Sequence, residues 1–344
     1  MSKIVYLFGA GASYGERYTT NNGQKRQGAI MRGVPIVNEF VNSIGYLISD
    51  IESTKASDQF PATQEQIENI IENLNWLKEK CNQYPTIDTY AKQLFITEGI
   101  KGENYLKLKN ALSLFLTLSQ KKEKRDLRYD GFIASLIQEK LKFPDEITLL
   151  SWNYDCQFEF AFADYLKDKG INDIWKALNV SCKTTNYRLN SGFGVVKLNG
   201  TAMAYDNKKG NQLWDIFFNT QGMSLENLAE MHFVKNTYST NVKNALSFAW
   251  EQDDDFTKQL FERVKNAETL VVIGYSFPYV NRTVDRSIIQ SMTNLRKVYI
   301  QDPIAEEIKE SFEATLLKTQ TLSIKIEYVL RTGLNQFVIP NELS

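Results

Sequence analysis

The sequence predicts an α/β fold in which a mostly parallel sheet is covered by helices on both faces and carries a large helical insert. Short apolar runs recur along the chain, and each is followed by turn residues and helical periodicity. The runs lie at residues 4–8, 147–152, 194–198, 269–273 and 297–300. Strands that alternate with helices are typical of parallel sheets. With 344 residues, 43% of them hydrophobic, the chain can bury a sizeable core.

The first run ends in the glycine-rich turn Gly9-Ala10-Gly11-Ala12-Ser13. This pattern predicts a buried strand that turns sharply into a helix. The free N–H groups and the dipole of a helix start favour a phosphate group. The dinucleotide fingerprint GxGxxG needs its third glycine one position before Gly15, so plain turn chemistry is an equal alternative. No P-loop sequence, GxxxxGKS or GxxxxGKT, occurs in the chain.

A polar stretch and a long helical region separate the first two predicted strands. Residues 18–33 are rich in Thr, Asn, Gln and Gly and end at Gly33-Val34-Pro35, which predicts a mobile loop. From residue 37 to residue 141 apolar residues recur at helical spacing, as at Ile67, Ile70, Ile71, Leu74 and Leu77. We therefore expect a sheet domain formed by residues 1–36 and 142–344, and a helical insert formed by residues 37–141.

Composition excludes several classes of protein. Lys and Arg number 40 against 41 Asp and Glu, so no overall field would concentrate nucleic acid or an anionic membrane. Cys81, Cys156 and Cys182 include no CxxC pair, which argues against a disulfide framework and a structural zinc site. No segment approaches the ~18 apolar residues of a membrane span, and the start lacks a signal-peptide core. We expect a cytoplasmic protein that binds neither metal nor membrane.

Small and amide-bearing residues follow each of the other predicted strands. They are Asn153-Tyr154-Asp155, Asn199-Gly200-Thr201, Gly274-Tyr275-Ser276, and Gln301 with Asp302. Ligands of open parallel sheets bind beyond the carboxyl ends of the strands, so these residues would converge on one cleft. A single Asn or Asp after a strand is also a common turn former or helix cap, and that alternative stays open for each residue alone.

In order and spacing, these motifs resemble those of the sirtuin (silent information regulator) superfamily. They are most similar to the sirtuin-like NAD-consuming domains of bacterial antiphage defence systems. The segments that carry the resemblance are 9–13, 33–35, 152–155, 197–200 and 274–277. The resemblance implies a Rossmann-like domain that binds NAD and breaks its nicotinamide–ribose bond.

The resemblance also implies a role for each candidate site residue. Gly9, Ala10, Gly11, Ala12 and Ser13 would hold the pyrophosphate, and Pro35 would lie at the bound NAD. Asn153 would position the nicotinamide ribose or an attacking water, and Asp155 would lie at the carboxamide end. Gly274, Tyr275 and Ser276 would approach the phosphate and the adenosine, and Gln301 and Asp302 would contact the adenosine.

The chain departs from this family in two places. The paired cysteines of the zinc module in deacetylating sirtuins are missing, which argues against protein deacylation. The histidine that supplies the catalytic base in the family is replaced by Asn199, and an amide accepts no proton at neutral pH. The one histidine, His232, lies outside the motif and is expected to be structural or a surface residue.

Two functions follow from these departures. The first is an NAD hydrolase in which Asn153, Asn199 and Asp155 orient a water, because an oxocarbenium-like ribose needs a positioned water more than a deprotonated one. It would be an antiphage effector that depletes NAD. The second is a catalytically weak or inactive sensor or scaffold subunit that binds NAD or ADP-ribose, which Asn199 favours.

The resemblance further implies that the chain works in an assembly. The expected partners are further copies of the chain, or a separate ATPase, Argonaute or phage-sensing subunit. A basic run suggests contact with DNA, at Lys121, Lys122, Lys124, Arg125 and Arg128. Glu123 and Asp126 interrupt the run, so a solvated helix end is the plainer interpretation. We expect no direct binding of nucleic acid.

Overall fold

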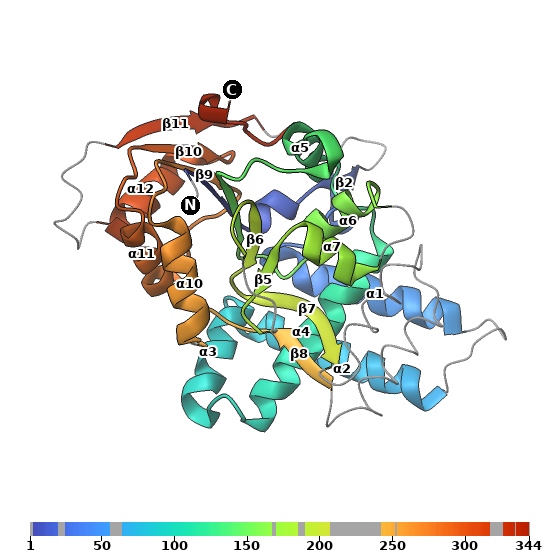
Figure 1. The fold of residues 1–344 in the computed structure, drawn as a ribbon. Coiled ribbons are helices and arrows are strands. Elements are labelled where there is room, and N and C mark those ends of the chain that lie inside the picture. Colours follow the sequence, from blue (N-terminus) through green and yellow to red (C-terminus); the bar gives the residue numbers. More distant parts are fainter. Residues whose placement is uncertain are drawn as a thin grey trace.

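A computed structural model describes residues 3–19, 25–55, 64–166, 170–184, 190–206, 242–251, 253–316, 326–333 and 335–343 (Figure 1). Its centre is a seven-stranded sheet in the order β11-β10-β9-β1-β4-β6-β5, and every neighbouring pair is parallel. The strands are β1 (Ile4–Phe8), β4 (Ile147–Ser151), β5 (Val180–Cys182), β6 (Gly194–Lys197), β9 (Thr269–Ile273), β10 (Lys297–Gln301) and β11 (Glu327–Arg331). The predicted α/β fold is confirmed.

β1 is the middle strand of the sheet, and the order in which later strands are added reverses there. β4, β6 and β5 extend the sheet on one side, and β9, β10 and β11 extend it on the other. Phe8 lies opposite both Ser151 and Ile273, so the three central strands end at the same level. Open α/β sheets bind their ligands beyond the carboxyl ends of the strands at such a switch point. The residues that directly follow β1, β4 and β9 are therefore the candidates for a ligand site.

Alternate residues of each strand enter different cores. Tyr6 and Phe8 pack with α5 (Leu127–Leu136), α6 (Gln157–Ala163) and α7 (Ile171–Ala177). Val5 and Leu7 pack with helices on the opposite face, namely α10 (Asp254–Val264), α11 (Arg282–Ser291) and α12 (Ala305–Leu316). Figure 1 shows these two helical layers on either side of the strands. Because β1, β4 and β9 are buried throughout, their sequences are mostly apolar and recognisable.

Four helices form a separate core beside the sheet: α1 (Phe40–Lys55), α2 (Gln64–Gln83), α3 (Ile87–Glu98) and α4 (Glu103–Lys122). The hairpin of β7 (Gly200–Asp206) and β8 (Val242–Leu246) packs on this core through Ala202 and Leu246. Figure 1 shows the hairpin between the helices and the sheet. By contrast, α5 packs on the sheet, although the sequence placed it in the helical insert. Since β7 begins directly after Asn199, the helical core is connected to the end of β6.

The chain after β1 differs from the sequence prediction in two places. The glycine turn does lead into a helix, but this helix is a single turn of 3-10 helix, η1 (Ala10–Ser13), and the next element is a strand. Instead of a loop at residues 18–33, β2 (Glu16–Thr19) pairs with β3 (Lys25–Arg32), while residues 20–24 lie outside the described chain. Arg17 anchors this hairpin by donating two hydrogen bonds to the Glu39 carboxylate, at 2.8 and 2.6 Å. A buried ion pair between distant residues leaves no trace in local composition.

The last residues of the chain cover part of the α5 face of the sheet. Phe337 is buried in that core, and the hydroxyl of Tyr6 donates to the carbonyl oxygen of Val338 at 3.2 Å. The other short helices of the described residues are η2 (Val37–Glu39), η3 (Glu139–Leu141) and η4 (Asn341–Leu343).

Within the described part of the chain, no helix is long and apolar enough to cross a bilayer. The same residues contain no group of three or more His, Cys, Asp or Glu arranged to hold a metal ion. Cys81, Cys156 and Cys182 all belong to the described residues and form no disulfide.

Candidate functional site

Two glycine turns meet at the carboxyl ends of β1 and β9. The N–H of Gly9 donates to the carbonyl oxygen of Ile273 at 3.0 Å, and the N–H of Gly11 donates to that of Gly274 at 2.9 Å. A Cβ atom on Gly9 would lie 2.6 Å from the Gly274 oxygen, and one on Gly274 would overlap the backbone nitrogen of Ala12. These glycines allow the two turns to touch. The N–H groups of Gly9 and Gly11 are therefore used inside the protein, although the sequence pattern predicted that they would face a phosphate.

Replacing Gly274 tests this contact. Gly274 has φ +59°, and we expect Gly274→Ala to lower the free energy of unfolding by about 2–3 kcal/mol, because a left-handed conformation and a backbone overlap both disfavour a Cβ atom. Gly131→Ala in α5 is the control, because a Cβ atom there meets nothing within 4 Å and should stabilise the helix by about 0.5–1 kcal/mol. Urea unfolding measures both. Equal stability of the two variants would contradict the close contact of the turns.

Asn153 is fixed at the end of β4 by its amide nitrogen. Nδ2 donates to the carbonyl oxygen of Gly9 at 2.8 Å and to Oγ of Ser13 at 3.0 Å. The Ser13 hydroxyl also shares a hydrogen bond of 2.8 Å with the hydroxyl of Tyr129. Because both amide hydrogens are used within the protein, Oδ1 is the atom that Asn153 can offer to a ligand or a water. The Ser13 hydroxyl belongs to this network, so any phosphate contact of Ser13 falls to its backbone.

Asn199 lies at the end of β6 and offers an oxygen in the same way. Its Nδ2 donates to the carbonyl oxygen of Trp152 at 3.3 Å and to the hydroxyl of Tyr154 at 3.5 Å. Its Oδ1 is buried and has no hydrogen-bond partner among the described residues. A buried oxygen without a partner costs roughly 1–3 kcal/mol. This oxygen is therefore suited to a donor from outside the chain, such as a hydroxyl group or a water.

Asp155 faces the start of α6. Its Oδ1 accepts the N–H of Gln157 at 3.3 Å, and its carbonyl oxygen accepts a bond of 2.6 Å from Nζ of Lys197. Lys197 also lies 2.8 Å from Glu159, and both of these side chains are fully buried. Burial raises the pKa of Asp155, and the Lys197 ammonium counteracts this shift. These contacts favour the helix-start interpretation that the sequence left open for Asp155.

Asp285 in α11 is a buried carboxyl group that the sequence did not single out. It accepts hydrogen bonds from Nε1 of Trp152 at 3.0 Å and from the hydroxyl of Tyr275 at 2.7 Å. The rings of Trp152 and Tyr275 are stacked, with centroids 6.1 Å apart. Burial raises the pKa of Asp285 to about 7, and the two donors limit the shift. The carboxyl group thus joins the ends of β4 and β9 across β1.

The raised pKa of Asp285 predicts a pH dependence of stability. The folded protein binds more protons than the unfolded chain from about pH 4, the ordinary value for Asp, to about pH 7. The free energy of unfolding should therefore decrease as the pH rises through this range, by up to about 1.4 kcal/mol for each unit of pKa difference. Asp285→Asn removes this dependence, and the amide can still form hydrogen bonds with Trp152 and Tyr275. Urea unfolding over this range should show the wild type losing stability relative to the variant, and a constant difference would refute the shift.

The other predicted residues of the two turns are divided between surface and interior. Ala10 and Ser276 are exposed, and Gly11 is half-buried, so these three border solvent at the carboxyl edge. Ala12 is buried in the core beneath α5. Pro35 is buried and follows Val34, whose N–H donates to the Ser13 carbonyl oxygen at 2.8 Å.

Gln301 and Asp302 follow β10, at a greater distance from β1. The Gln301 side chain bonds to three backbone groups of residues 333–338, at 2.7, 2.6 and 3.0 Å. It therefore holds the C-terminal segment in place. Asp302 is half-buried, and its Oδ1 accepts the N–H of Ile304 at 3.1 Å. Both side chains thus have structural partners within the chain.

Arg128 of α5 lies beside the glycine turn of the candidate site, whereas the sequence singled it out only as part of the basic run. Its Nη2 donates to the carbonyl oxygen of Ala12 at 2.9 Å and to Asp126 at 2.6 Å. A guanidinium group beside the glycine turn favours an anionic ligand there, although Asp126 balances part of its charge. Its neighbours in the basic run are also paired, with Lys122 close to Asp50 and Arg125 close to Asp130. These pairs favour the solvated helix end over a DNA-binding patch.

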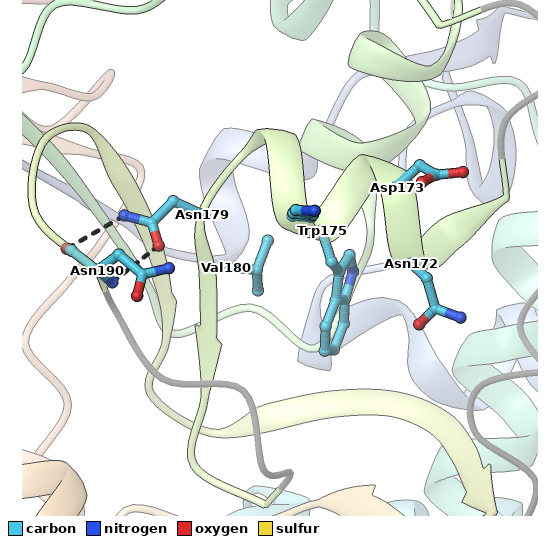
Figure 2. A pocket seen from close by; sticks show the side chains of 7 residues that line it. Asn172, Asp173, Trp175, Asn179, Val180 and Asn190 are labelled. Atoms are coloured by element: carbon cyan, nitrogen blue, oxygen red, sulfur yellow. Dashed lines mark hydrogen bonds between the residues drawn. The ribbon is translucent and has the colours of Figure 1, made fainter.

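Figure 2 shows a pocket at the opposite edge of the sheet, lined by Asn172, Asp173, Trp175, Lys176, Asn179, Val180 and Asn190. Val180 is the first residue of β5, and Asn190 precedes β6, so the pocket lies at the amino ends of these strands. Its volume of about 280 Å³ is at the lower limit of ligand pockets, roughly 300–1,000 Å³. The Asn179 side chain bonds to the backbone of Asn190 at 2.9 Å, as drawn in Figure 2. This pocket is separate from the candidate site.

His232 lies outside the described residues.

No protein-family model matches the chain, and no curated protein matches it. The fold and the candidate site define an α/β protein with a parallel sheet and a polar carboxyl edge. At that edge lie two asparagines, Asn153 and Asn199. The amide nitrogen of each donates to the protein backbone, so the side-chain oxygen of each is the atom that can accept a hydrogen bond from a ligand.

Proposed function

We propose that this protein hydrolyses NAD at the nicotinamide–ribose bond and releases nicotinamide and ADP-ribose. The observation that carries the proposal is the pair of oriented amides at the switch point. Asn153 is fixed against the end of β1, at 2.8 Å from the Gly9 oxygen, and the buried Oδ1 of Asn199 has no partner among the residues that the structure describes. The sirtuin-like order of the motifs adds the substrate class.

The chemistry of this bond suits amide side chains. Nicotinamide leaves as a neutral molecule, and the ribose develops the positive charge of an oxocarbenium ion in the transition state. Oxygens that accept hydrogen bonds from a water hold it in line with the ribose carbon and stabilise positive charge. Asn153 and Asn199 can both supply such oxygens. Arg128 and the exposed residues Ala10 and Ser276 border the place for the pyrophosphate.

Product analysis tests the function. The purified protein is incubated with NAD, and nicotinamide and ADP-ribose are separated by chromatography. We expect the two products in equal amounts, at a rate proportional to the protein concentration. Release no faster than in a heat-denatured sample would overturn the hydrolase.

A second function is a sensor or scaffold that binds NAD or ADP-ribose without turning it over. The presence of an amide at position 199 favours it, because a mechanism that needs a general base there loses about 10²–10⁴-fold in rate. Titration calorimetry distinguishes the two functions. Heat of NAD binding with no nicotinamide in the recovered solution supports the sensor, and product in that solution supports the enzyme.

The cellular role follows from the same resemblance. The protein acts in the cytoplasm as an effector of antiphage defence that depletes NAD. It works as a homo-oligomer or beside a separate ATPase, Argonaute or phage-sensing subunit, and it binds NAD without contacting nucleic acid or membrane. Light scattering of the purified chain gives the oligomeric state, and a monomeric mass would leave the separate subunit as the expected partner.

A further inference from the structure

Asp285 lies in the middle of a chain of hydrogen bonds next to the candidate site. Nδ2 of Asn281 donates to the hydroxyl of Tyr275 at 3.1 Å, and this hydroxyl donates to Oδ2 of Asp285 at 2.7 Å. Oδ1 of Asp285 accepts a hydrogen bond from Nε1 of Trp152 at 3.0 Å. Each carboxyl oxygen thus has one donor, and the residue is only 1% exposed.

Trp152 connects this chain to both asparagines of the site. It directly precedes Asn153 in the sequence, and its carbonyl oxygen accepts a hydrogen bond from Nδ2 of Asn199 at 3.3 Å. Its backbone N–H donates to the carbonyl oxygen of Phe8 at 3.0 Å. The residue is therefore fixed at two points, the backbone and the indole nitrogen. Releasing the indole would loosen the residue on which the positions of both amides depend.

Tyr275 connects the same chain to the glycine turns. It follows Gly274, whose carbonyl oxygen accepts the N–H of Gly11 at 2.9 Å. The rings of Tyr275 and Trp152 stack in the core formed with α10, α11 and α12, with centroids 6.1 Å apart. One carboxyl group of α11 thus holds the turn after β9 and the segment after β4 together.

A purely structural link at this place would not need a carboxyl group. Burial raises the pKa of Asp285 to about 7, which means that ionisation of this group lowers the stability of the folded protein. An amide could accept from the Trp152 indole and bond to the Tyr275 hydroxyl without this loss. Groups whose ionisation is disfavoured by burial are concentrated at functional sites. The hydrogen bonds and this comparison together indicate that the carboxylate serves the site.

We propose that Asp285 is a positioning residue for the cleavage of NAD. Its ionised carboxylate holds Trp152 and Tyr275, and through Trp152 it fixes the two asparagines that orient the water. This role rests on the proposed function. A carboxylate accepts on both oxygens, as its two donors require, whereas protonation turns one oxygen into a donor. The bond to Tyr275 would then have to reverse, and the geometry of the chain would change.

The groups packed around Asp285 leave the two donors as its partners. Burial raises the pKa of Tyr275 well above the ordinary range, so its hydroxyl stays neutral. On α11, the guanidinium carbon of Arg282 lies 4.1 Å from the ring centre of Tyr279, and Nε of Arg286 donates to a carbonyl oxygen of α12 at 2.9 Å. Neither arginine bonds to Asp285. The buried residues of α10 and α12 are apolar except for one threonine.

The test is the rate of nicotinamide release over the pH range around 7. The wild-type kcat should rise about 3–10-fold as Asp285 ionises with a pKa of about 7, the effect of strengthening one hydrogen bond. Asparagine resembles the protonated carboxyl group, with one acceptor and one donor. Asp285→Asn should therefore keep the low-pH kcat of the wild type at every pH in this range.

Asp285→Leu removes both hydrogen bonds. It should lower kcat about 10²-fold relative to the ionised wild type, the effect of a small displacement of groups that orient the reactants. The KM for NAD should change less than about threefold, because Asp285 does not touch the substrate. Steady-state kinetics with NAD measures both constants.

Two further variants separate positioning from a general loss of structure. Trp152→Phe keeps a stacked ring and removes Nε1, so it should lower kcat without a large change in KM. If Asp285 acts through Trp152, the double variant Trp152→Phe, Asp285→Leu should be no slower than Asp285→Leu alone. Two independent structural defects would instead multiply their effects on kcat. Circular dichroism confirms that each variant is folded, and the pH profile of Asp285→Asn decides the question even if Asp285→Leu does not fold.

Asp254→Asn is the matched control. It makes the same exchange in the first turn of α10, where the side chain is exposed, and should leave kcat and its pH profile unchanged. If the wild type cleaves NAD and Asp285→Asn has the wild-type profile, or if the losses in the double variant multiply, Asp285 is not a positioning residue and the proposed function stands. If the wild type releases no nicotinamide, both the function and this role are overturned.

Discussion

Asn153→Ala is expected to reduce nicotinamide release by about 10²–10³-fold, the effect of removing one oriented polar group from a transition state. The variant loses the oxygen that holds the water, and it also loses the two donors that join β4 to Gly9 and Ser13. We expect kcat to decrease far more than KM increases, because the lost interaction acts mainly on the transition state. Steady-state kinetics with NAD measures both.

Asn73→Ala is the matched control for Asn153→Ala. Asn73 is half-buried on α2, and its Nδ2 donates to the carbonyl oxygen and to Oδ1 of Asn69 in the same helix, both at 2.8 Å. We expect its kcat and KM to equal those of the wild type. If Asn153→Ala is folded and cleaves NAD as fast as Asn73→Ala, the orienting role of Asn153 is wrong.

Lys197→Met is expected to destabilise the fold by about 3–5 kcal/mol, because it leaves a buried carboxylate without its counter-ion. Glu159 is fully buried and lies 2.8 Å from Nζ of Lys197. Burial lowers the pKa of Lys197, but the nearby carboxylates of Glu159 and Asp155 outweigh it and hold the pKa above the ordinary range. The ammonium also donates to the Asp155 carbonyl oxygen at 2.6 Å. Urea unfolding monitored by tryptophan fluorescence measures the loss.

The double variant Lys197→Met, Glu159→Leu identifies the cause. Replacing both partners of a buried ion pair with apolar residues is often nearly neutral, so the double variant should regain most of the stability lost in Lys197→Met. An additive loss in the double variant would show that the two charges do not stabilise each other. The lysine would then act through its bond to Asp155.

The central strands could be predicted from the sequence because both of their faces are buried. β1 consists of apolar residues from end to end, β4 and β9 are mostly apolar, and the turns after them carry glycine, asparagine or serine. β5 and β11 were not predicted. The first has three residues, and the second is only partly buried at the end of the sheet, so neither has a distinct pattern.

The location of the candidate site at the carboxyl edge could be predicted from the sequence. The contacts that each side chain makes there could not. Sequence analysis brought Asn153, Asn199 and Gly274 together, and the structure assigns Gly274 to contact between turns. Arg128 and Asp285 reach the edge from helices far away in the sequence. Their positions depend on how those helices pack on the sheet, and a single sequence does not encode that packing in its local pattern.

The same reason explains the error in the region of β2 and β3. A stretch of polar residues predicts a loop when each residue is judged by its neighbours in sequence. Here the Arg17 side chain is buried, and its charge is stabilised by the Glu39 carboxylate and by a hydrogen bond of 3.1 Å to the Val34 carbonyl oxygen. The hairpin is thus stabilised by tertiary contacts next to the glycine turn.

A crystal structure of the protein with ADP-ribose tests the central claim most directly. We predict the pyrophosphate at the exposed side of Gly11 and Ser276, and the terminal ribose within hydrogen-bond distance of Asn153 and Asn199. Fluorescence titration under the same conditions should show saturable binding that Asn153→Ala weakens. Density for ADP-ribose in the pocket of Figure 2, or a carboxyl edge that stays closed while ADP-ribose binds elsewhere, would contradict the claim.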